Sequence, residues 1–101
     1  MRTTPFRQAE AEALAAMTPD ERARFDVAEA EEEARLQVAE LVYAARTRAG
    51  LTQAELARRM GTQQSVISAV ENGGRVPSVS TLWRIARALD LRLTIDMAAA
   101  S

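Results

Sequence analysis

The sequence predicts an all-α protein: a compact helical bundle with an N-terminal helical extension and one short C-terminal β-strand. Helix-capping sequences recur along the chain, as at Thr18–Glu21 and Thr52–Glu55. Large apolar residues are sparse before residue 36 and then recur at helical spacing, so the core should lie in the later part of the chain. Residues 91–97 (LRLTIDM) instead alternate apolar and polar side chains, which is typical of a strand.

Charge divides the chain into two parts. Residues 1–40 hold five Arg and ten acidic residues and therefore carry a net charge of −5, whereas residues 41–101 hold eight Arg and four acidic residues and carry +4. This division indicates a basic domain that binds nucleic acid, joined to an acidic segment with a different partner.

Composition excludes several classes of site. The chain has no Cys and no His, which rules out disulfides, zinc fingers, thiol nucleophiles and His-based acid–base catalysis. It has no Gly-rich phosphate loop and no visible cluster of carboxylates around a pocket, so we expect no enzyme, cofactor or metal. No run of about 18 apolar residues exists to span a membrane. Glu10 and Glu12 stand where a signal peptide needs its apolar centre, so we expect a cytoplasmic protein.

The acidic front of the chain is predicted to be helical. Residues 5–17 form a helix with a thin apolar stripe, and Thr18 caps a second helix with Glu21. From there to Arg48, either one long helix runs through or two helices meet near Glu31–Glu33. We treat residues 1–35 as an acidic helical arm. It is either a solvated helix or a docking arm for a basic protein, whose contacts would be Phe6, Leu14, Met17, Phe25, Glu32 and Leu36.

Two short helices joined by a tight turn follow the arm. One begins at Thr52 and ends at Met60, Gly61 allows the turn, and residues 63–71 form the second. A further helix, capped by Ser78, runs through Leu89. The layout within residues 36–90 is that of a helix-turn-helix DNA-binding domain.

The second helix of this pair carries the predicted base contacts. Gln pairs with adenine through two hydrogen bonds, and Ser can bond to several bases. No Arg or Lys lies within residues 60–74, so the commonest guanine contact is missing and sequence readout should be modest. The alternative is a solvated polar helix face. The predicted base contacts are Gln63, Gln64, Ser65 and Ser68.

Predicted phosphate contacts flank that helix. Gln53 lies at the start of the preceding helix, where free backbone N–H groups attract phosphate, although it could be an ordinary exposed first-turn residue. Asn72 and Arg75 follow the base-reading helix. Arg46 and Glu71 belong to helices that face the same core, so we expect a structural ion pair between them.

The predicted strand needs a partner, because one strand cannot satisfy its own backbone N–H and C=O groups. No other stretch of the chain has a strand pattern, so the simplest partner is a second chain. The dimer contacts would be Leu91, Leu93 and Ile95, within a dimerisation strand at residues 91–97.

Residues 36–90 resemble the Cro/lambda-repressor type of helix-turn-helix protein, also called the xenobiotic-response-element (XRE) family. The resemblance implies a bundle of about five helices, usually acting as a dimer on double-stranded operator DNA, and it implies the same phosphate, base and ion-pair residues. Thr62 and Ala69 depart from the family pattern at the edge of the base-reading surface. The matching residues are Arg46, Gly50–Gln53, Glu55–Ala57, Gly61, Gln64, Ser65, Ile67, Ser68, Glu71–Gly73, Pro77, Leu82, Ile85, Ala86 and Leu89.

A narrower resemblance covers the whole chain. Residues 1–7 (MRTTPFR), the acidic helical segment, the helix-turn-helix and the closing strand together resemble HigA-type antitoxins of type II toxin–antitoxin modules. The strand is similar to that of HipB antitoxins, where it pairs between subunits. The resemblance implies neutralisation of a basic, HigB/RelE-like mRNA-cleaving toxin and repression of the protein's own operon. The alternatives are a stand-alone XRE-family transcriptional repressor and an interaction scaffold that has lost DNA binding.

Overall fold

The computed structural model describes residues 5–100, and within that range the chain forms five helices. No helix of the described part is long and apolar enough to cross a membrane. The chain divides into two compact units, one ending at Glu33 and one beginning at Ala34. The helices are α1 (Pro5–Ala15), α2 (Pro19–Arg48), α3 (Gln53–Met60), α4 (Gln64–Glu71) and α5 (Val79–Ala88).

The first unit contains α1 and the first half of α2. Thr18 Oγ1 accepts a hydrogen bond from Glu21 N at 3.2 Å, and Glu21 Oε2 accepts one from Thr18 N at 3.3 Å, which confirms the predicted capping box. The prediction that α1 reaches residue 17 was wrong, since the helix ends at Ala15. None of the described side chains in this unit is fully buried, so helix propensity rather than a core supports it.

One long helix connects the acidic segment to the second unit. Of the two predicted alternatives, a single 30-residue α2 is present rather than two helices meeting near Glu31–Glu33. The reason is local, because no Gly or Pro lies between Asp20 and Arg48 and the stretch is rich in Ala, Glu and Arg. The helix stops before Gly50, whose φ of 74° belongs to the left-handed region.

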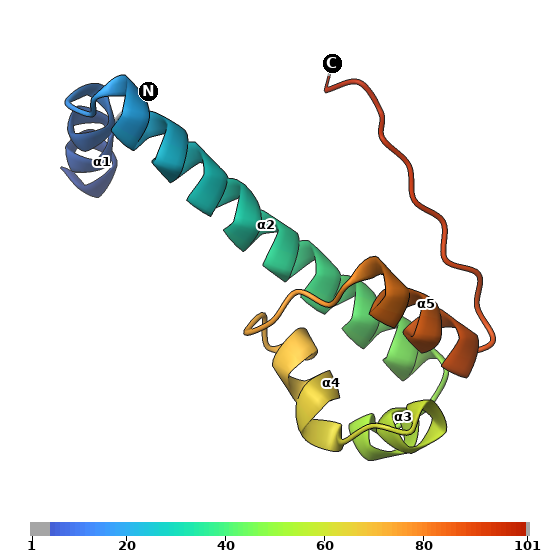
Figure 1. Ribbon diagram of the computed structural model, residues 1–101. Helices are drawn as coiled ribbons and strands as arrows, with labels where there is room; N and C mark the ends of the chain where they lie inside the picture. Colours follow the sequence, from blue (N-terminus) through green and yellow to red (C-terminus); the bar gives the residue numbers. More distant parts are fainter. Residues whose placement is uncertain (1–4, 101) are drawn as a thin grey trace. The chain divides into compact units, whose positions relative to one another are not determined.

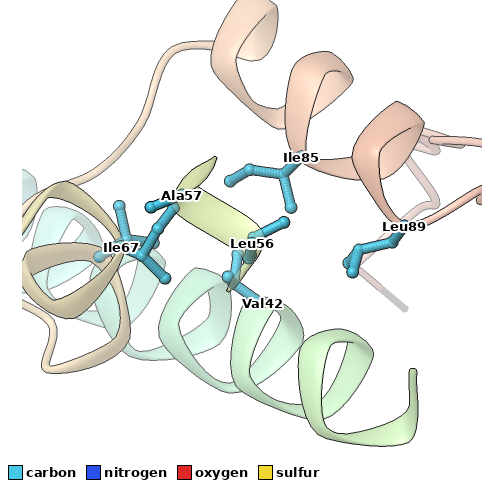
Figure 2. Close-up of a cluster of buried hydrophobic side chains, with 7 residues drawn as sticks. Val42, Leu56, Ala57, Ile67, Ile85 and Leu89 are labelled. Carbon is cyan, nitrogen blue, oxygen red and sulfur yellow. The ribbon is translucent and has the colours of Figure 1, made fainter. Parts of the chain in front are cut away.

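The second unit holds the hydrophobic core. In Figure 1, α3, α4 and α5 gather around the C-terminal part of α2. Leu56 of α3 and Ile67 of α4 are fully buried at the centre (Figure 2). Because apolar residues from four helices meet here, the three short helices are stabilised by packing that none could supply alone. The core cluster consists of Val42, Leu56, Ala57, Ile67, Val70, Ile85 and Leu89.

Local signals define the turn between α3 and α4. Thr52 and Glu55 form the predicted capping box at the start of α3, with Thr52 Oγ1 accepting from Glu55 N at 3.1 Å. At the other end Gly61 takes a φ of 68°, and its N–H donates to the carbonyls of Ala57 and Arg58. A left-handed residue at this point reverses the chain sharply, and α4 starts three residues later at Gln64.

Three expectations from the sequence need correction. Residues 91–97 form no β-strand in the described chain, because no second strand is available to pair with their backbone N–H and C=O groups. Gln63 is the N-cap of α4 rather than its first helical residue. The last helix, α5, ends at Ala88 and Leu89 is its C-cap, although Ser78 does cap its start as predicted.

An ion pair ties α2 to α4. Arg46 Nε donates to Glu71 Oε2 at 2.6 Å, and Arg46 Nη2 donates to Glu71 Oε1 at 2.8 Å. The guanidinium also donates to the carbonyl of Leu51 at 2.7 Å and lies 5.5 Å from the ring centre of Tyr43. Arg46 is only 9% exposed, so the paired carboxylate is what makes burial of its charge tolerable.

The pair shifts both pKa values. Burial alone raises the pKa of Glu71, but the hydrogen bonds from Arg46 and Gln53 and the charge of Arg46 outweigh burial, and the net pKa is lowered. The hydrogen bond with Glu71 raises the pKa of Arg46. The native structure therefore favours the charged form of both groups, and this preference contributes to stability.

Replacing Glu71 with Gln should lower the free energy of unfolding by about 3 kcal/mol near pH 7, because Arg46 would keep a buried charge without a counterion. Since the pKa of Glu71 is lowered, its contribution is complete above the ordinary Glu pKa of about 4.3 and is lost as the pH falls from there through the native value. Urea unfolding of both proteins should therefore show a difference that is constant above about pH 5 and shrinks below about pH 4. Glu40→Gln, at an exposed carboxylate of α2, is the control. An equal loss in both variants would contradict this role for Glu71.

Candidate nucleic-acid interface

The outward face of α4 carries the predicted base contacts. Ile67 and Val70 are buried beneath the helix, so its polar residues occupy the other side. Gln64 and Ser65 are exposed and Ser68 is half-buried, and helical spacing places all three on that outer side. Gln63 is exposed at the N-cap position, and its side chain makes no capping hydrogen bond. The helix thus presents short polar side chains at its N-terminal end, as a helix in the major groove requires.

A chain of side-chain amides holds Gln64 in place. Gln64 Nε2 donates to Gln53 Oε1 at 3.4 Å, and Gln53 Nε2 donates to Glu71 Oε1 at 3.1 Å. The same Glu71 oxygen accepts from Arg46, so the buried ion pair is connected to the surface through Gln53. This arrangement limits the rotamers of both glutamines before any ligand arrives, which lowers the entropic cost of a contact.

The N-terminus of α3 is suited to an anion. Thr52 and Glu55 satisfy each other's backbone N–H groups, which leaves the other first-turn N–H groups of the helix at the surface. Gln53, the first residue of α3, is half-buried and lies beside Gln64 of α4. A phosphate at this point would meet backbone N–H groups and lie next to the base-reading residues.

The loop after α4 contains the other two predicted phosphate contacts. Asn72 Oδ1 accepts from Gly74 N at 2.8 Å, so the amide oxygen shapes the loop and the NH2 group remains for a partner. Gly73 has a φ of 77°, which lets the chain turn away from the helix. Arg75 is exposed on this loop.

Two arginines join α3 to α5 in a way that the sequence did not predict. Arg84 Nη2 donates to the carbonyl of Met60, the last residue of α3, at 2.7 Å. Arg59 Nη1 donates to the carbonyl of Ala88, the last residue of α5, at 3.1 Å. Each arginine therefore caps the C-terminus of the other helix. No local pattern predicts these bonds, because the partners are 24 and 29 residues apart.

The predicted arm contacts belong to two different units. Phe6 is 77% exposed, Leu14, Met17 and Phe25 are half-buried, and Glu32 is exposed, all in the first unit. Leu36 lies instead in the second unit, where a Cβ added at Gly73 would stand 4.0 Å from its Cδ2. Five of the six predicted contacts therefore lie in the first unit and one in the second.

The C-terminal segment leaves apolar side chains accessible. Leu91 and Ile95 are exposed, whereas Leu93 is half-buried. Residues 91–94 line a hollow of about 150 Å³ together with apolar residues of α5 and of the C-terminal part of α2, among them Leu41 and Leu82.

Comparison with known proteins agrees with this geometry. The chain is 47% identical over 64 residues to antitoxin HigA1 of Mycobacterium tuberculosis, a match that covers 63% of this chain and 42% of HigA1. It is 36% identical over 59 residues to antitoxin HipB of Escherichia coli O6:H1, covering 58% of this chain and 63% of HipB. The match thus spans less than half the length of HigA1 and less than two thirds of the length of HipB.

A solved structure of a HipB variant, described as its complex with an O2 20mer, superposes with a TM-score of 0.55 at 34% identity. The superposition covers 63% of this chain and 89% of that one.

The helix-turn-helix family matches residues 42–95, which is more than half of the chain and includes α3, α4, α5 and the end of α2. The chain belongs to the XRE-type helix-turn-helix family of DNA-binding proteins.

Proposed function

We propose that the protein is an antitoxin and transcriptional autorepressor. The observation that carries the DNA-binding half of this proposal is the polar face of α4, whose Gln64 is held by Gln53 and, through it, by the Arg46–Glu71 pair. Two of its relatives, HigA1 and HipB, are named antitoxins, which supports the other half. The alternative is a stand-alone repressor of the same family, without a toxin partner.

In this proposal α4 enters the major groove of the operator. Gln63, Gln64, Ser65 and Ser68 contact base edges, while Gln53, Asn72 and Arg75 contact phosphates on either side of the helix. Since α4 has no Arg or Lys, base contacts supply a modest preference and the phosphate contacts supply most of the affinity.

Replacing Gln64 and Ser68 together with Ala should reduce the preference for operator over random DNA by roughly tenfold or more, since each good pairing contributes about 1–3 kcal/mol of discrimination. Binding to random duplex should change little, because the phosphate contacts remain. Competitive gel-shift titration measures both quantities. Ser80→Ala, at an exposed position of α5, serves as the matched control. An unchanged preference in the double variant would defeat the base-contact assignment.

We propose further that the acidic arm, residues 1–35, binds a basic toxin of the HigB/RelE-like type and covers or distorts its catalytic surface. The arm carries no buried core of its own among its described residues, and the side chain of Phe6 is 77% exposed. Its acidic residues complement a basic protein.

A chain lacking residues 1–34 should still bind operator DNA, because every residue of the core cluster lies after that point. The truncated chain should no longer protect cells that express the toxin gene next to its own. In the full-length protein, Phe6→Ala with Leu14→Ala should weaken toxin binding, while the neighbouring Gln8→Ala should not. Co-purification and a growth assay test these statements. Full protection by the truncated chain would end the docking-arm proposal.

Dimerisation through residues 91–97 completes the proposal. The segment keeps its alternating pattern and exposes Leu91 and Ile95. Leu91 N donates to the carbonyl of Ala86 at 2.8 Å, but no second strand within the described chain pairs with the segment. A second copy that pairs with it would satisfy those backbone groups and form the strand that one chain alone does not form.

Leu93→Asp combined with Ile95→Asp should convert the dimer to a monomer and weaken operator binding, because two half-sites would no longer be contacted by one particle. Thr94→Asp adds a charge to the opposite side of the segment and should leave the dimer largely intact. Sedimentation velocity distinguishes the species. If the double variant sediments as the wild type does, the segment is not the dimer interface.

A further inference from the structure

The second unit carries a cluster of arginines that the proposed operator contacts do not use. Arg59, Arg84 and Arg87 line a hollow of about 360 Å³ together with Met60 and Ala88. All three arginines are exposed. Two of them are held in place by the carbonyl hydrogen bonds that join α3 to α5.

The positive charge of this hollow is not neutralised within the described residues. None of its three arginines forms an ion pair there, and Arg87 makes no hydrogen bond. The acid nearest along α3 is Glu55, whose carboxylate accepts from Thr52 N at 3.3 Å. The pKa of Glu55 is lowered mainly by its hydrogen bonds with Thr52, and the charges of Arg58 and Arg59 lower it less. The guanidinium donors left over are thus available to an external anion.

The hollow continues a series of arginines that begins at a proposed phosphate contact. Arg75 shares an adjacent polar hollow with Arg84, and Arg84 in turn lines the hollow with Arg59 and Arg87. The connecting hollow is lined by Val66 and Val70 of α4, by Thr62 before that helix and by Pro77 after it. The arginine series therefore runs alongside α4, from the loop after the helix to the turn before it.

This course favours a nucleic-acid backbone as the ligand. A helix seated in a major groove is flanked by two sugar-phosphate backbones, and a row of guanidiniums beside the helix can follow one of them. We propose that Arg59, Arg84 and Arg87 form an additional, sequence-independent phosphate site for duplex DNA. The proposal rests on the proposed DNA-binding function and adds residues that supply affinity without base preference.

Arg87→Gln in the full-length protein is the main test, because Arg87 makes no bond that supports the fold. Its binding to operator and to random duplex, measured against KCl concentration, should weaken several-fold, with a slope of log K against log salt smaller by about 0.9 for one lost phosphate contact. Arg59→Gln with Arg87→Gln should roughly double that change in slope. The ratio of operator to random binding should stay as in the wild type.

Arg58→Gln is the matched control. It removes the same charge from a residue of α3 that does not line the hollow, and it should leave the slope of log K against log salt nearly unchanged.

Equal slopes for Arg87→Gln and Arg58→Gln would overturn the proposal, because the arginines would then act only through diffuse charge. A second result would also overturn the proposal: the Arg87→Gln variant binds DNA as the wild type does but no longer binds an acidic protein or a second copy of the chain. The ligand of the hollow would then be a carboxylate rather than a phosphate. Failure of the proposed function is a separate result, namely a wild-type protein with no preference for its operator. The slope on random duplex tests the hollow in that case as well.

Discussion

The Arg46–Glu71 ion pair is the interaction on which the arrangement of α2, α3 and α4 depends. It joins the last turns of α2 to the last residue of α4, with two hydrogen bonds of 2.6 and 2.8 Å. Because Arg46 is buried, its charge needs this carboxylate, and the paired geometry in turn restricts where α4 can lie. The carboxylate also accepts from Gln53, which bonds Gln64. One buried charge pair therefore restrains both the position of α4 and the orientation of Gln64, the residue that we propose contacts a base edge.

In the proposed function, different residues supply the affinity for DNA and the selectivity for a site. The polar side chains on the outer face of α4 are only Gln and Ser, which under the proposed function would make few and interchangeable base contacts. Cations lie around the helix instead, at Arg75 and in the hollow of Arg59, Arg84 and Arg87. Arg84 and Arg59 would then have two roles, since each also caps a helix of the second unit. A protein built in this way would hold DNA mainly through its backbone and choose a site through a small number of amide and hydroxyl contacts.

The acidic arm is organised by a different principle. Its helices are defined by capping and by residue propensity, with Thr18 and Glu21 at the start of α2 and no breaker after Asp20. None of its described side chains is fully buried, whereas the second unit buries Leu56 and Ile67 completely. A segment with secondary structure but no core leaves apolar side chains such as Phe6 exposed, and this exposure is the physical basis for the proposal that the arm binds a protein partner.

The sequence by itself determined the features of this protein that depend on residues close together in the chain. The caps at Thr18, Thr52 and Ser78 and the turn at Gly61 depend on residues within four positions of one another, so they were predictable. The polar face of α4 followed from helical spacing. The Arg46–Glu71 pair followed from the prediction that their helices face one core, and the family resemblance implied the same pair. Only the tertiary structure decided that Gln53 bonds Glu71 and Gln64, that Arg84 and Arg59 cap each other's helices, and that Leu36 lies with the second unit. These contacts join residues far apart in the chain, and no local pattern encodes such distances. Residues 91–97 also show what the sequence alone does not determine. Their alternating pattern predicts a strand, but a strand forms only where a second strand lies close enough to pair with it.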